Sequence, residues 1–123
     1  MTNRKRILLV EDEEIILADL ARTLRKQGYE IAGTAASGEE AIEAAAGTKP
    51  DLVLMDVRLQ GSINGLEAAR RIREASEVPI LFITANSIEL APDIAELPGH
   101  YGSITKPFSP NQLRETIEAI LSS

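Results

Sequence analysis

The chain lacks cysteine and tryptophan, and its aromatic side chains are only two phenylalanines and two tyrosines. Without cysteine it can form neither a disulfide bond nor a thiolate metal site, which fits a reducing compartment. With so few aromatic residues, the core must be built mainly from aliphatic side chains and alanine. The overall composition, 44% apolar and 26% charged, is still that of an ordinary globular protein.

Long apolar runs are also missing, and none approaches the roughly 18 residues that a membrane-spanning helix needs. The basic residues Arg4, Lys5 and Arg6 are not followed by an apolar segment of signal-peptide length. The net charge of −6 argues against direct binding to nucleic acid or to anionic membranes. We therefore expect a cytoplasmic protein with no direct nucleic-acid partner and no membrane insertion.

The length of 123 residues indicates one domain with a sizeable core. The sequence shows no internal repeat, low-complexity segment or domain boundary. We therefore expect residues 1–123 to form a single domain without an output domain.

Strand-like and helix-like segments alternate along the chain. Apolar runs predict strands over residues 7–10, 30–35, 52–56 and 79–83, and a short fifth strand that includes 103–105. Helical spacing follows over 13–27, from Ser37 to about residue 46, from Leu66 onward, and after Ser109. Residues 47–50 and 60–65 have loop composition.

This β-then-α alternation predicts an α/β fold with a doubly wound parallel sheet of five strands. Ligands in such sheets bind beyond the carboxyl ends of the strands, where the strand order reverses. The fourth helix, over residues 86–97, contains Pro92, which disrupts a helix interior. We expect that helix to be short or irregular.

Polar residues stand at the carboxyl ends of the predicted strands. Glu11 and Asp12 follow the first strand, Asp56 ends the third, Thr84 follows the fourth, and Lys106 follows the fifth. Clustered carboxylates repel one another unless a cation such as Mg²⁺ offsets their charge. A carboxylate can also serve as a nucleophile that forms an aspartyl phosphate, with a lysine and a hydroxyl stabilising the phosphoryl oxygens. Each residue alone has an ordinary structural explanation as a cap, a turn or a solvated side chain, but together they indicate a site for Mg²⁺ and phosphate.

With these residues in place, the chain resembles the receiver domain of two-component response regulators. The resemblance covers nearly the whole chain. It rests on the acidic pair Glu11-Asp12, on Asp56, on Thr84-Ala85 and on residues 106–108, Lys-Pro-Phe. It implies a flavodoxin-like fold with strand order 2-1-3-4-5. It also implies a signalling switch, not an enzyme in the usual sense, that phosphorylates and dephosphorylates itself. Its partners would be a histidine kinase or histidine phosphotransfer protein and an unknown downstream effector.

The resemblance also implies roles for the acidic residues. Asp56 would accept the phosphoryl group from a phosphohistidine. Asp12 would bind Mg²⁺ directly, and Glu11, where many receivers have Asp, would hold the metal through water. The backbone carbonyl of Arg58 would complete the set of protein ligands.

The resemblance implies that three further residues contact the phosphoryl group or leave space for it. Lys106 would pair with the Asp56 carboxylate or its phosphate, and Thr84 would move toward the phosphate and report its presence. Ala85 would leave space for the phosphoryl group to enter. The resemblance also implies a cis peptide bond between Lys106 and Pro107.

The sequence departs from the family pattern at two further places besides the fourth helix. Ser103 stands where receivers usually have Tyr or Phe, and Tyr101, two residues earlier, would lie on the same face of the strand and could partly substitute. The loop after Asp56 is one residue longer than usual and lacks the usual proline. We expect a signal that leaves the domain by an unusual route.

Three other functions fit the sequence less well. A Mg²⁺-dependent phosphohydrolase would normally carry a second acid two residues after the nucleophile, where this chain has Arg58. A pseudo-receiver would be expected to have lost Asp56, Asp12 or Lys106. A flavin-binding protein would carry a phosphate-cradling loop after the first strand, which is missing here.

Overall fold

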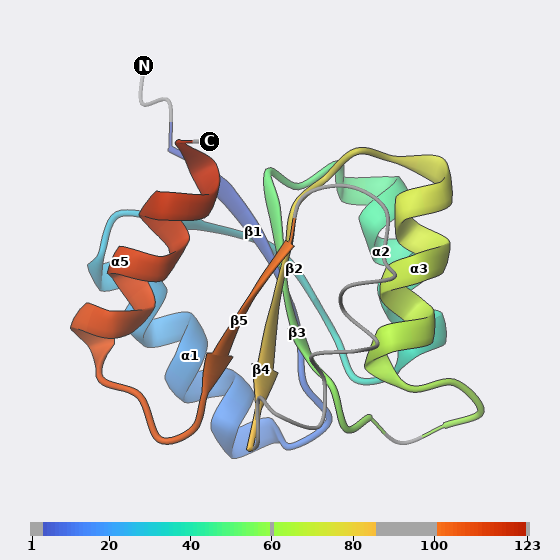
Figure 1. Ribbon diagram of the computed structural model, residues 1–123, viewed down its shortest axis with the longest axis horizontal. Coiled ribbons are helices and arrows are strands. Elements are labelled where there is room, and N and C mark those ends of the chain that lie inside the picture. Colours follow the sequence, from blue (N-terminus) through green and yellow to red (C-terminus); the bar gives the residue numbers. More distant parts are fainter. Residues whose placement is uncertain (1–3, 60, 86–100, 123) are drawn as a thin grey trace.

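The structure, a computed structural model, describes residues 4–59, 61–85 and 101–122. The five strands are β1 (Arg6–Val10), β2 (Glu30–Ala35), β3 (Leu52–Asp56), β4 (Ile80–Thr84) and β5 (Tyr101–Thr105). They form one parallel sheet in the order β2-β1-β3-β4-β5. Helices α1 (Glu14–Lys26) and α5 (Pro110–Leu121) cover one face of the sheet, and α2 (Gly38–Thr48) and α3 (Gly65–Ala75) cover the other (Figure 1). The predicted doubly wound α/β sheet and its strand order are confirmed.

The core has two layers because side chains of a strand alternate between the faces of a sheet. One layer, against α2 and α3, contains Leu8, Val10, Val53, Met55, Ile80 and Phe82 from the strands. The other, against α1 and α5, contains Ile7, Leu9, Leu52, Leu54, Leu81 and Ile83. The central strands β1, β3 and β4 are thus apolar toward both faces, as expected for a sheet that helices cover on both sides.

Local sequence explains where several helices begin. The side chains of Ser37, Asn64 and Ser109 each accept a hydrogen bond from the backbone N–H three residues later, which satisfies a donor that the helix leaves unpaired. At Ser109 the side chain of Gln112 also accepts from the Ser109 N–H at 2.8 Å, so the N-terminus of α5 has a complete capping box. Gly28 follows the end of α1 with a positive φ of 95°, a conformation that suits glycine.

One predicted loop is partly wrong. Residues 47 and 48 belong to α2, which ends at Thr48. The Thr48 hydroxyl donates to the Ala44 carbonyl at 2.7 Å and so supports the last turn. Lys49 then adopts a left-handed conformation with φ 49°, and Pro50 follows. Because a lysine gives no sequence signal for a left-handed turn, the predicted helix ends before the observed end of α2 at Thr48.

The predicted irregular helix over residues 86–97, with Pro92, lies outside the described residues. None of the described helices combines the length and the apolar character needed to cross a membrane.

Candidate functional site

The register of the sheet brings the predicted site residues to one edge. Val10 pairs with Met55, so Glu11, the next residue after Val10, lies beside the end of β3 where Asp56 stands. On the other side, Asp56 pairs with Ile83, and Thr84 pairs with Thr105, directly before Lys106. The reversal of strand order occurs between β1 and β3, because β2 lies on one side of β1 and β3 on the other. This is the position at which open α/β sheets bind ligands.

A cleft with a volume of about 380 Å³ opens at this edge. Every site residue predicted from the sequence lines it: Glu11, Asp12, Asp56, Arg58, Thr84, Ala85 and Lys106. Across the described ranges, the polar side chains counted as buried are those of Glu11, Asp56 and Thr84, and all three face this cleft. Burial of polar groups is unfavourable unless a partner compensates it, so their gathering in one place indicates a ligand site.

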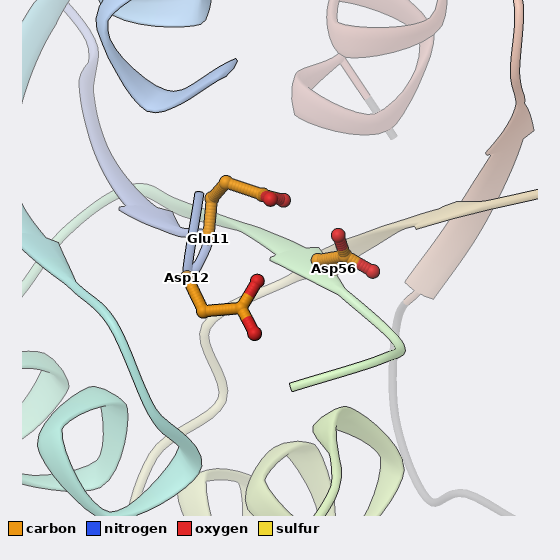
Figure 2. A group of neighbouring side chains, drawn as sticks. All are labelled: Glu11, Asp12 and Asp56. Atoms are coloured by element: carbon orange, nitrogen blue, oxygen red, sulfur yellow. The ribbon is translucent and has the colours of Figure 1, made fainter. Parts of the chain in front are cut away.

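Three carboxylates converge in the cleft. Glu11 and Asp12 extend from the end of β1 toward Asp56 at the end of β3 (Figure 2). Each offers an oxygen atom, and these oxygens all lie within 4.8 Å of one another. Oxygen ligands at this spacing suit a hard divalent cation.

Glu11 is the most buried of the three acids, with 2% of its surface exposed. Its Oε1 accepts a hydrogen bond from the Glu13 backbone N–H at 3.2 Å. Its Oε2 is buried and has no hydrogen-bond partner within the described part of the chain. Burial, followed by the neighbouring Asp56 carboxylate, raises the pKa of Glu11 from 4.5 to about 8. An orphaned carboxylate oxygen with this pKa marks a place where a cation would be strongly stabilised.

Asp56 has two partners of opposite character. Its Oδ1 accepts a hydrogen bond from the Arg58 backbone N–H at 2.9 Å. Its Oδ2 lies 3.6 Å from the Lys106 Nζ, which makes an ion pair that is too long for a hydrogen bond. The side chain of Asp56 is 10% exposed and that of Lys106 is 36% exposed, so the lysine reaches the acid from the solvent side.

The sequence did not predict the backbone N–H donors of the site. The N–H groups of Glu13 and Arg58 hold the carboxylates of Glu11 and Asp56, yet a backbone donor leaves no mark on residue type. The predicted loop over residues 60–65 is wrong at its last residue: Gly65 begins α3, and its N–H donates to the Val57 carbonyl at 3.0 Å. A Cβ there would lie 2.3 Å from the Asp56 carbonyl oxygen, so only glycine fits. A glycine directly after Asn64, a residue typical of helix N-caps, was the available clue.

The predicted departure from the family pattern lies on β5. Ser103 is exposed, and Tyr101 is half-buried and packs against the core layer beneath α2 and α3. The peptide bond between Lys106 and Pro107 is cis, as the resemblance implied. Whether Tyr101 substitutes for the usual aromatic residue stays a prediction.

Comparison with known proteins agrees with this geometry. The family model of the response regulator receiver domain matches residues 7–118. The transcriptional regulatory protein PdtaR of Mycobacterium tuberculosis is 42% identical over 118 residues, which cover 96% of this chain and 57% of that protein. The transcriptional regulatory protein YvrH of Bacillus subtilis is 42% identical over 115 residues, covering 94% of this chain and 48% of its own. The chain therefore spans about half the length of these relatives.

Solved structures show the same fold. The receiver domain of a sensor histidine kinase from Pseudomonas aeruginosa, with a magnesium ion in its active-site cleft, superposes with a TM-score of 0.85 at 30% identity. The alignment covers 98% of this chain and 99% of that one. The chemotaxis protein CheY4 of Vibrio cholerae also gives a TM-score of 0.85 at 30% identity, over 95% of this chain and 98% of that one. The sheet, the acidic cleft and the match over residues 7–118 place this chain in the response regulator receiver domain family.

Proposed function

We propose that this protein is a phosphorylation-controlled switch in which Asp56 accepts a phosphoryl group from a phosphohistidine. The donor would be a histidine kinase or a histidine phosphotransfer protein. The observation that carries the proposal is the setting of Asp56: a nearly buried carboxylate with two acids on one side and a lysine 3.6 Å away on the other. This setting suits a nucleophile that accepts a phosphoryl group, because a bound cation and the lysine could offset the added negative charge.

In the proposed reaction an Asp56 carboxylate oxygen attacks phosphorus, and the bond between phosphorus and the histidine nitrogen breaks. The imidazole leaves with the bonding electrons, and an aspartyl phosphate remains. The Arg58 N–H holds the other carboxylate oxygen, which orients the nucleophile before the attack. Lys106 would then contact the phosphoryl oxygens and stabilise the added negative charge.

The acidic residues fit Mg²⁺. The carboxylates of Glu11, Asp12 and Asp56 converge, and the orphaned Glu11 Oε2 lacks a compensating partner within the described residues. We assign the metal to these carboxylates and to the backbone carbonyl of Arg58, with Glu11 acting through water. A bound Mg²⁺ would supply positive charge that offsets the carboxylates and the phosphoryl oxygens.

Two residues on β4 and just after it complete the proposal. Thr84 would donate its hydroxyl to a phosphoryl oxygen, and its small displacement would report phosphorylation to the downstream effector. Ala85, an exposed residue at the mouth of the cleft, leaves room for the phosphoryl group. The domain would therefore act as a switch that catalyses its own phosphorylation and dephosphorylation, not as an enzyme with a separate substrate.

The remaining predictions concern the setting of the domain. A kinase partner and a downstream effector follow from the family, and their identities are open to experiment. A single receiver domain over residues 1–123, a cytoplasmic location and no direct contact with nucleic acid stay predictions from composition.

The test is phosphorylation by acetyl phosphate in the presence of Mg²⁺, followed by intact-mass measurement. We expect the parent protein to gain one phosphoryl group, and Asp56→Asn to gain none. Asp19→Asn, which changes an exposed aspartate on α1, is the matched control and should behave as the parent does. A parent protein that gains no mass, or a gain that survives Asp56→Asn, would refute the proposal.

A further inference from the structure

The loop that follows Asp56 is tied down at both ends. At its start the Arg58 N–H donates to the Asp56 Oδ1 at 2.9 Å, and at its end the Gly65 N–H donates to the Val57 carbonyl at 3.0 Å. These bonds lie within the loop and its own strand. Between these bonds, Leu59 and Ile63 pack against the core layer beneath α2 and α3.

A hydrogen bond to another element also holds the loop. The Ser62 hydroxyl donates to the Glu39 Oε2 at 3.1 Å, and Glu39 belongs to the first turn of α2, 23 residues earlier in the chain. Hydrogen bonds lower the pKa of Glu39: the largest is from its own backbone N–H, then comes the Ser62 hydroxyl, and the backbone N–H groups of Ser62 and Ile63 add to them. The carboxylate is therefore shared between the start of α2 and the loop.

Next to the hydrogen bond between Ser62 and Glu39, the loop also packs directly against α2. A Cβ at Gly38 would lie 2.7 Å from the Ile63 Cγ1, so the backbone of α2 is in direct contact with the loop. Gly61 adopts a positive φ of 115°, and a Cβ there would lie 3.4 Å from the Glu39 carboxylate oxygens. The chain thus turns tightly around the carboxylate of Glu39, which fits a specific contact better than a chance meeting of surface groups.

We propose that Glu39 is a positioning residue that restrains the loop carrying Arg58 and thereby raises the affinity of the acidic cleft for Mg²⁺. This inference rests on the proposed function, which assigns the Arg58 carbonyl to the metal. A mobile loop must lose conformational freedom when its carbonyl binds a cation, and a loop already held by Glu39 loses less. Glu39 itself needs no contact with the metal.

Amide hydrogen exchange and Mg²⁺ titration followed by NMR, both on the full chain, test the role. Glu39→Ala should speed exchange at the Ser62 and Ile63 amides. Outer-shell partners are typically worth about 10–100-fold in metal affinity, and for this exposed residue acting through a loop we expect about three- to tenfold weaker Mg²⁺ binding. Glu39→Gln keeps an oxygen acceptor and should restore most of the affinity.

Two further variants distinguish the restraint of the loop by Glu39 from the simple loss of a negative charge. Glu43→Ala removes the same charge from an exposed position on the same helix and should leave both measurements unchanged. Ser62→Ala keeps the charge and should weaken Mg²⁺ binding by about two- to threefold, because one donor is lost and the backbone donors remain.

Equal Mg²⁺ affinities for Glu39→Ala and Glu43→Ala would overturn the inference, as would unchanged exchange at the Ser62 and Ile63 amides. Equal weakening in Glu39→Ala and Glu39→Gln would show an effect of charge alone and would also overturn it. A parent protein that binds no Mg²⁺ would overturn the proposed metal site as well. If only the role of Glu39 is refuted, the proposed phosphorylation of Asp56 is unaffected.

Discussion

Glu11 should destabilise the folded protein at neutral and alkaline pH when no divalent cation is bound. Its pKa is about 8 in the folded protein against an ordinary value of 4.5, so between these values the folded state binds a proton that the unfolded state has released. Stability is therefore greatest below the lower pKa and falls by about 1.4 kcal/mol per pH unit as the pH rises through this window. Above it the loss levels off at on the order of 3–5 kcal/mol.

Replacement of Glu11 by glutamine removes this titration. The amide stays neutral, its oxygen can accept from the Glu13 N–H, and its NH₂ group can donate to the Asp56 carboxylate. From about pH 5 to about pH 8.5 in EDTA, we expect the stability advantage of Glu11→Gln over the parent to grow by about 3–4 kcal/mol. Urea denaturation at the two pH values measures it, and Glu43→Gln, an exposed change, should show no such growth.

Magnesium should reduce the difference in stability between the parent and Glu11→Gln. Millimolar Mg²⁺ should stabilise the parent at the higher pH and narrow the gap to Glu11→Gln, since a ligand that binds only the folded state stabilises it. If the difference between parent and variant were the same at both pH values, the reasoning about burial and the Asp56 carboxylate would be wrong. An unfavourable acid retained in the core of a site is a common trade of stability for function.

Three further changes test the local geometry. Gly65→Ala should lower the free energy of unfolding by about 2–4 kcal/mol in urea denaturation, because the new Cβ would lie 2.3 Å from the Asp56 carbonyl oxygen. Gly47→Ala, also in a helix but with no atom within 4 Å of a Cβ, should be neutral or stabilising by about 1 kcal/mol, and similar losses at both glycines would contradict the packing argument. Lys106→Met should slow phosphoryl uptake from acetyl phosphate at least about tenfold, while the free energy of unfolding changes by less than about 1 kcal/mol, and an unchanged rate would remove the lysine from the mechanism. Asn64→Ala should reduce thermal stability by about 1 kcal/mol through loss of the cap on α3, and an unchanged melting temperature would show that the cap is unimportant.

Much of the fold could be read from the chain because local and global signals agree. The apolar runs of β1 and β3, the caps at Ser37 and Ser109 and the glycine after α1 each act within a few residues. Boundaries differ from the prediction: the end of α2 depends on a left-handed lysine, and β4 begins and ends one residue later than predicted. Such details depend on backbone conformation, which residue types constrain only weakly.

For the site, the sequence alone predicted which side chains line the cleft and at which edge of the sheet they lie. Asp56 ends a predictable strand, Glu11 and Lys106 follow two others, and the carboxyl ends of parallel strands meet at one edge. Only the tertiary structure decided how these groups are held: the raised pKa of Glu11, the backbone donor at Arg58 and the contact between Glu39 and Ser62. Burial, backbone hydrogen bonds and contacts across 23 residues arise from the packing of distant segments, and no local pattern records them.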